Sequence, residues 1–323
     1  MLRRLSAMVV AVVVSLAWIA AWGQTYPNRM VRVILPFPAG SPTDTLLRTL
    51  GQEMTKTWGQ PVIVDNRPGA DAIIAAELCK NSPRDGYTYC LLDRGTNTLR
   101  HLRKDLPFDL SRDFEPVTQL IFSTLVLVGH PSIAAGSIAQ FIEVAKARPG
   151  QLNFGSLGTG TLPHLYLEWT KKQYNLDIVH VPFKGPPQLV QSLLGGEIHA
   201  TLLFLANFLG HIQSGKLKAL GVSGNKRSPL VPSVATLAEQ SKITIDDQVW
   251  FGLFAPAGAP RDNLLRMQKE VERIFAIDAF REKNLIAQAL EPVASSPDEF
   301  ARFIAADSQV VAELVRISGV RAE

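Results

Sequence analysis

Short apolar runs and longer helical patterns alternate along the first hundred residues of this chain. Val31–Leu35, Val62–Asp65 and Tyr87–Leu92 are rich in β-branched and aromatic residues, and runs of this length and composition predict strands. Between them, Thr45–Trp58 and Ala72–Lys80 carry apolar residues at the spacing of an amphipathic helix. Strands that alternate with helices in this way predict an α/β fold with a parallel sheet.

A second series of the same kind begins at Leu125–Gly129. The later strands are expected at Leu152–Phe154, Ile178–Val181, Ala200–Leu205 and Ala219–Val222. The later helices are expected at Ile138–Ala147, Leu162–Tyr174, Gln188–Leu194, Asn263–Phe275 and Pro297–Ile317. Because no long linker separates the two series, we expect two α/β lobes, each a sheet flanked by helices, joined by a hinge. We place the first lobe at residues 24–121 and 252–323, and the second lobe at residues 122–251.

The first 23 residues have the pattern of a secretory signal peptide. Arg3 and Arg4 precede the apolar stretch Met8–Ala20, and Ala21 and Gly23 place small residues where signal peptidase needs them. An N-terminal membrane anchor is the alternative, but the apolar stretch is shorter than the ~20 residues that a span requires. We therefore expect an exported, periplasmic protein that begins at or near Gln24.

The charge balance argues against a nucleic-acid partner. The chain has 33 Lys and Arg residues against 29 Asp and Glu residues, so no large excess of either sign remains. The basic cluster Arg100, Arg103 and Lys104 is followed by Asp105 and Asp109, which favours a solvated, self-neutralised surface.

The two cysteines, Cys79 and Cys90, leave two possibilities open. In the oxidising compartment that export implies, they can form a disulfide that closes a short loop and contributes roughly 3 kcal/mol. They can equally be two buried thiols. There is no CxxC pair, so the sequence suggests neither a zinc site nor a redox motif.

Motifs of catalysis are missing from the sequence. Ser156 directly follows Gly155, so there is no G-x-S-x-G elbow, and the glycine-rich segment around it lacks the lysine of a P-loop. The six histidines are scattered without the spacing of metal ligands. We expect no enzyme activity, no metal and no cofactor.

Two glycine-containing loops have the chemistry of an anion site. The first loop, Pro36–Asp44, follows a predicted strand, and its end has Ser41 as a helix N-cap, Pro42 at the first helical position and Asp44 as the third helical residue. The second loop, Asn153–His164, has the same place between a strand and a helix. Helix N-termini present free N–H groups and a positive dipole end, which favour an anion.

Nine motifs in order carry a resemblance over the whole mature chain. They are the first loop, Gly59–Pro61, Asn66–Ala70, Asp85–Thr88, Gly155–Gly160, Val179–Gly185, Lys226–Pro229, Trp250–Leu253 and Ser295–Pro297. In them the chain resembles the Bug or TctC family of exported solute receptors, which serve tripartite tricarboxylate transporters.

The resemblance implies a monomeric, two-lobed periplasmic binding protein of type II-like architecture. It implies a small carboxylate ligand, namely a dicarboxylate, a tricarboxylate, an aromatic carboxylate or an acidic amino acid, which is delivered to integral membrane transporter subunits. It also implies that the ligand lies among the first loop, the second loop and a third loop, Asp93–Thr96. Carried over by position, the ligand-binding residues are Phe37, Ala39, Gly40, Ser41, Thr43, Asp44, Gly95, Thr96, Ser156, Gly158, Thr159, Gly160 and His164.

Three departures from the family pattern bear on the ligand. Ser41 replaces a glycine and is followed by Pro42, which has no N–H to donate. Leu202–Phe204 replaces a polar segment, which makes one wall less polar if these residues line the cleft. Arg94 replaces a small polar residue, and we include it among the ligand-binding residues. If it reaches the cleft, it favours a second acidic group on the ligand; otherwise it pairs with Asp93 or with solvent.

Several of these residues have an equally simple structural interpretation. Asp44 can be a helix-start acid that caps a turn, and His164 can be a neutral imidazole in the first turn of its helix. The function also keeps an alternative: a ligand-sensing co-receptor for a membrane signalling protein, without transport, needs the same cleft.

Overall fold

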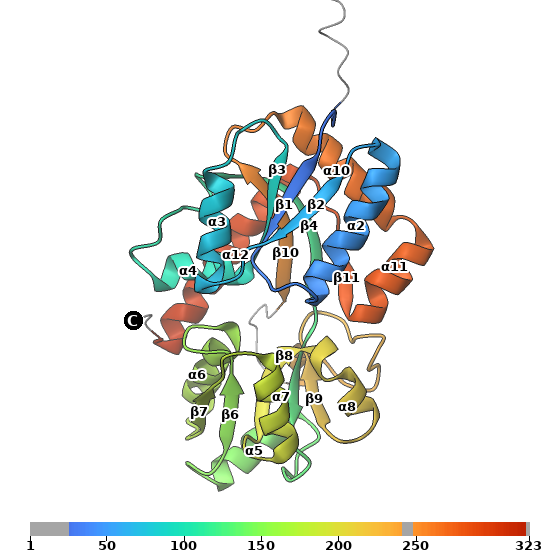
Figure 1. Ribbon diagram of the computed structural model, residues 1–323. Helices are drawn as coiled ribbons and strands as arrows, with labels where there is room; N and C mark the ends of the chain where they lie inside the picture. The colour runs from blue at the N-terminus through green and yellow to red at the C-terminus, as the bar shows by residue number, and fades with distance from the viewer. Residues whose placement is uncertain (1–25, 241–247, 321–323) are drawn as a thin grey trace, which may run out of the picture.

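The computed structural model describes residues 26–240 and 248–320. The predicted signal peptide lies outside the described residues. Two β-sheets, one above the other in Figure 1, each carry helices on both faces. The expected pair of α/β lobes is therefore confirmed.

The sheet of the first lobe has six strands within the described residues. In spatial order they are β11 (Leu290–Pro292), β4 (Phe114–Ser123), β10 (Val249–Pro256), β3 (Thr88–Asp93), β1 (Val31–Leu35) and β2 (Val62–Asn66). β1 pairs in parallel with β2 and β3, as the alternating pattern predicts. β10 and β11 run antiparallel to their neighbours, so the sheet is mixed and not wholly parallel as expected.

Helices cover both faces of this sheet. On one face lie α3 (Ile73–Lys80), α4 (Arg94–Leu102) and α12 (Pro297–Ser318), and on the other lie α2 (Pro42–Trp58), α10 (Arg261–Phe275) and α11 (Asp278–Asn284) (Figure 1). Cys79 of α3 and Cys90 of β3 form a disulfide, with the two Cα atoms 6.0 Å apart. Of the two possibilities that the sequence leaves open, the structure thus has the bridge.

The sheet of the second lobe has five strands within the described residues. In spatial order they are β7 (Val179–Pro182), β6 (Asn153–Ser156), β8 (Ala200–Phe204), β5 (Leu125–Gly129) and β9 (Lys218–Val222). Its helices are α5 (Ile138–Ala147), α6 (Leu162–Tyr174), α7 (Pro186–Gly195), α8 (Leu209–Gln213) and α9 (Leu237–Gln240). In the part of the chain that the structure describes, no helix combines the length and the apolar character needed to cross a membrane.

The chain passes from one sheet to the other near Thr124 and again before β10. The lobe boundaries expected at 121/122 and 251/252 fall inside β4 and β10, and both strands belong wholly to the first sheet. α12, a helix of the first lobe, also packs on α6 of the second lobe. The lobes are thus joined by strand crossings and by one helix contact.

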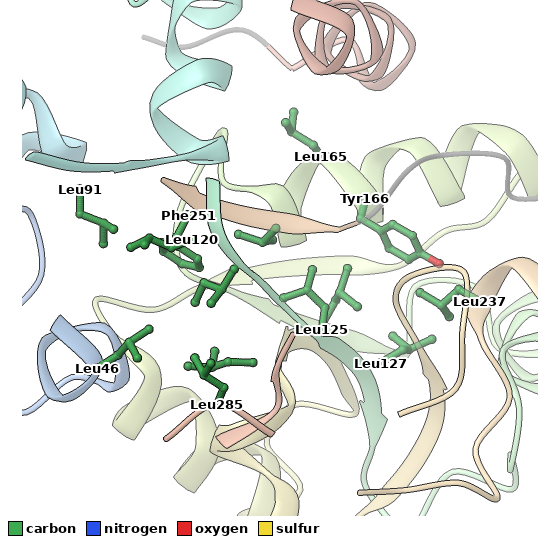
Figure 2. Close-up of a cluster of buried hydrophobic side chains, with 14 of the residues drawn as sticks. Leu46, Leu91, Leu120, Leu125, Leu127, Leu165, Tyr166, Leu237, Phe251 and Leu285 are labelled. Atoms are coloured by element: carbon green, nitrogen blue, oxygen red, sulfur yellow. The ribbon is translucent and has the colours of Figure 1, made fainter. Parts of the chain in front are cut away.

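One apolar core runs through both lobes. The same cluster contains Leu46 and Leu91 of the first lobe and Leu127 and Leu165 of the second, and Figure 2 shows these side chains around the crossing strands. Phe251 of β10 is 3% exposed and belongs to this cluster. Burial of this apolar surface stabilises both lobes together.

Candidate functional site

The first loop has the helix start that the sequence predicts. Ser41 has an extended backbone and accepts the Asp44 N–H at 3.2 Å, and Pro42 is the first residue of α2. Gly40 has a φ of +82°, a left-handed conformation that glycine adopts without strain. The Gly40 N–H points back into the turn, where it donates to Asp44 Oδ2 at 2.9 Å.

Asp44 holds the first loop in place. It is 3% exposed and accepts hydrogen bonds from Arg48 Nε at 3.0 Å and from Asn66 Nδ2 at 2.9 Å, besides the one from Gly40. Burial alone would raise its pKa, but these hydrogen bonds outweigh burial and hold the pKa below its usual value. Asn66 also donates to the Phe37 carbonyl. The structural interpretation of Asp44 therefore accounts for both of its oxygens.

The second loop is built on Ser156, which ends β6 and is fully buried. Its Oγ accepts the Gly158 N–H at 3.0 Å and lies 2.6 Å from Nε2 of His180 on β7. Gly158 and Gly160 have φ angles of +119° and +81°, and Thr159 between them is exposed. The loop thus turns away from the sheet and leaves Thr159 at its tip.

Two histidines stack beneath the second loop. The rings of His164 and His180 lie 4.0 Å apart with their planes 11° from parallel, and His164 Nδ1 accepts the Gly160 N–H at 3.1 Å. Burial lowers the pKa of His164, and burial together with the neighbouring His164 lowers the pKa of His180 to about 4. Both rings are therefore neutral at neutral pH, as the sequence interpretation of His164 expects. His180 was not among the expected site residues; the parallel pairing of β6 with β7 brings it there.

The third loop is a direct junction between β3 and α4. Asp93 is the N-cap of α4 and accepts the Thr96 N–H and hydroxyl, each at 3.0 Å. Burial raises the pKa of Asp93, although the hydrogen bonds from Thr96 act in the opposite direction. Gly95 is exposed and Thr96 is buried.

The side chain of Arg94, the residue of the third loop that departs from the family pattern, is buried inside the protein. Its side chain is 2% exposed, its Nε lies 3.0 Å from Asp307 Oδ1, and its Nη1 donates to the Gln248 carbonyl at 2.8 Å. Asp307, on α12, also accepts from Asn97 and from the Trp250 indole. The partner of Arg94 is thus neither Asp93 nor solvent but a buried carboxylate far away in the sequence. With this pairing the guanidinium is held inside the protein, and a contact between Arg94 and a second acidic group of the ligand stays a prediction.

The first and third loops, and the end of β8 in the second lobe, meet at Phe251. The Phe37 ring of the first loop lies 5.8 Å from the Phe251 ring, and Asp93 is the strand partner of Phe251 in the β3–β10 pair. On the other side, the ring of Phe204, at the end of β8, lies 6.1 Å from the Phe251 ring. A Cβ added at Gly160 would lie 3.0 Å from Leu102 of α4, so the second loop also approaches the first lobe. The segments that the sequence groups are therefore neighbours in space.

The expected site residues differ widely in exposure. Ala39, Gly40, Gly95 and Thr159 are exposed, and Phe37, Ser41, Gly158 and Gly160 are half-buried. Thr43, Asp44, Arg94, Thr96, Ser156 and His164 are buried. The three loops lie at the N-termini of α2, α4 and α6, where the positive end of each helix dipole suits an anion.

A cavity of about 350 Å³ lies elsewhere, at the hinge. Its wall includes Ser123 and Thr124 at the first crossing and the segment Ser223–Pro229 after β9. None of the expected ligand-binding residues lines it. Within the described residues, no group of three or more His, Cys, Asp or Glu side chains is placed to hold a metal ion.

Comparisons with known proteins agree on one family. Residues 46–320 match the model described as "Tripartite tricarboxylate transporter family receptor". Protein BugT of Bordetella pertussis is 33% identical over 318 residues, which cover 97% of each chain.

Solved structures of the same kind superpose along most of the chain. One solved as "R. palustris Rpa4515 with adipate" has a TM-score of 0.82 at 28% identity and covers 92% of this chain and 99% of that one. MatC of Rhodopseudomonas palustris, solved with bound malate, has a TM-score of 0.77 at 26% identity, covering 90% and 100% of the two chains. The periplasmic binding protein BugD has a TM-score of 0.79 at 26% identity, covering 92% and 100%.

Proposed function

The chain belongs to the tripartite tricarboxylate transporter family of receptors, and on that basis we propose that it is a periplasmic receptor that closes on a small carboxylate. The ligand binds between the two lobes, among the first, second and third loops. The protein then delivers it to integral membrane subunits of a transporter. The receptor performs no chemistry on the ligand.

The observation that carries this proposal is that three helix starts lie where the two lobes meet: the first and third loops adjoin Phe251, and the second loop approaches Leu102 of α4. Each of α2, α4 and α6 begins at one of the three loops. The positive dipole ends of these helices favour a carboxylate without a charged side chain from the protein. The adipate and malate of the two similar structures are ligands of this chemical kind.

The two-lobed plan supports delivery by closure. The first and third loops belong to one sheet and the second loop to the other, so a ligand that contacts all three bridges the lobes. Such a ligand favours the closed state by its additional contacts there. A closed pair of lobes is a shape that a membrane partner distinguishes from the open one.

Thermal-shift measurement of the mature protein against a panel of carboxylates tests the proposal. A ligand present at a hundred times its dissociation constant stabilises the fold by about 2.7 kcal/mol, which is a clear shift of the melting temperature. If no carboxylate in the panel shifts the melting temperature, the proposed ligand class is wrong.

Intact-mass analysis of exported protein tests the compartment: a mass that includes Met1–Gly23 would contradict export by a cleaved signal peptide.

A further inference from the structure

Three phenylalanines form a continuous apolar contact between the lobes at the point where the loops meet. Phe37 and Phe251 are in edge-to-face contact at 5.8 Å, and Phe251 and Phe204 lie 6.1 Å apart. Both distances lie within the range of favourable ring pairs. Phe37 comes from the first loop, Phe251 from a strand that enters the first lobe, and Phe204 from the second lobe.

Phe251 is covered while its two neighbours keep exposed surface. Phe251 is 3% exposed, whereas Phe37 and Phe204 are half-buried. Leu162, the first residue of α6, is a further half-buried apolar side chain packed on the same core. β8 runs parallel to β6, so Phe204 lies at the sheet edge that carries the second loop. Both lobes therefore contribute apolar side-chain surface next to the loops.

The single cationic side chain of the loops is buried and faces a carboxylate of the protein itself. Arg94 is the single Lys or Arg within the first, second and third loops, and it is paired with Asp307. The one imidazole of these loops, that of His164, has a pKa lowered by burial. The helix N-termini favour one carboxylate, whereas a further charged group that lay against the phenylalanines would leave water without a compensating partner.

From this arrangement we propose that the ligand is a carboxylate with an apolar body, preferentially aromatic, whose body packs on Phe37 and Phe204. The inference rests on the proposed function and adds the ligand class. A ring or alkyl chain buries its own apolar surface and that of the two side chains, and affinity rises with the area buried. Compact polar acids such as malate gain nothing from this surface.

Isothermal titration calorimetry with two series of acids tests the proposal. One series has apolar bodies (benzoate, phenylacetate, hexanoate), and the other is compact and polar (malate, citrate, aspartate). We expect the tightest apolar acid to bind at least about tenfold more tightly than the tightest polar one, since about 1.4 kcal/mol of buried apolar surface corresponds to a factor of ten. Tighter binding by the polar series overturns the inference and leaves the proposed function standing. If no acid of either series binds, the proposed function fails with it.

Variants of Phe204 separate direct contact from an effect on folding. We expect Phe204→Asn to weaken binding of the best apolar acid about tenfold and to leave the affinity of the polar acids unchanged. Phe204→Leu, which keeps an apolar side chain, retains most of the affinity.

The matched control is Phe303→Asn. Phe303, on α12, is also a half-buried aromatic residue, but it packs on Phe122 and Trp250. An equal loss for both series in Phe204→Asn, or the same loss in the control, would mean that Phe204 acts through the fold and would overturn the assignment.

Discussion

The loops of the first lobe are anchored by ionised side chains, whereas the loop of the second lobe is anchored by neutral ones. Asp44 holds the first loop through Arg48, and Arg94 holds the third loop through Asp307. The second loop depends on the stacked rings of His164 and His180 and on the Ser156 hydroxyl. The same strand-to-helix plan is thus stabilised by two kinds of chemistry, which differ in their response to substitution and to pH.

The largest effect is expected for Arg94→Ser, which leaves the Asp307 carboxylate buried without its cation. Breaking such a pair from one side costs about 3–5 kcal/mol, measured as the free energy of unfolding in urea. In a double-mutant cycle with Asp307→Asn, the second substitution should cost much less than it does alone. Ligand affinity should change equally for dicarboxylates and monocarboxylates. A nearly unchanged stability, together with a loss confined to dicarboxylates, would instead place Arg94 at the ligand.

Asp44→Asn should destabilise the protein by about 2–3 kcal/mol, because an amide cannot accept all the hydrogen bonds that the carboxylate receives from charged and polar donors. Chemical denaturation measures this loss. The matched control is Glu299→Gln, since Ser296, Pro297 and Glu299 repeat the cap of the first loop at the start of α12, where Glu299 is exposed. A smaller loss is expected there. Equal losses in the two variants would show that Asp44 is only a helix cap and not the anchor of the loop.

Acidification should weaken the anchor of the second loop before that of the first loop. The folded pKa values of His164 and His180 lie below the ordinary histidine value, so the unfolded chain binds more protons. The stability that the two neutral histidines give the folded state is complete above about pH 6.5. It is lost as the pH falls toward the pKa of about 4 of His180. Since His180 is partly exposed, we expect a loss on the order of 1–2 kcal/mol.

Unfolding free energies measured between pH 7 and pH 4.5 check this order of events. His180→Asn should flatten the pH dependence, and Asp44→Asn should leave its slope unchanged, because Asp44 stays ionised in this window. The pH dependence of the unfolding free energy could instead disappear in Asp44→Asn and persist in His180→Asn. That result would mean that the first loop, and not the second, is the acid-sensitive one.

Gly158→Ala should have the smallest effect on stability. Gly158 has a φ of +119° with no atom within 4 Å of an added Cβ, so the cost is backbone strain of about 1 kcal/mol. Gly215, at a φ of +72° and also without close atoms, is the matched control in the same lobe. Calorimetry should show weaker carboxylate binding for Gly158→Ala and unchanged binding for Gly215→Ala. Equal affinities would exclude a close approach of the ligand to the second loop.

Much of the fold follows from local patterns. The helices expected at Ile138–Ala147 and Leu162–Tyr174 have these bounds in the structure, since each has a clear apolar period and a start signal. In contrast, the strands β4, β10 and β11 and the helices α4, α8, α9 and α11 were not expected. Arg94–Leu102 has few apolar residues, and it is helical because Asp93 caps it and because it packs on α12. A three-residue strand such as β11 carries too little pattern to identify.

The sequence by itself determined the strands and helices that have a clear local pattern, the caps of α2 and α12, and the three loops, because each depends on residues a few positions apart. Only the tertiary structure decided which side chains face the loops. Asn97 and Asp307, 210 residues apart, share one buried network. Arg94 joins the same network because burial of its charge requires a carboxylate, and packing alone brings that carboxylate from α12. The contact of Phe37, Phe251 and Phe204 likewise exists only once strands from both lobes meet at the hinge.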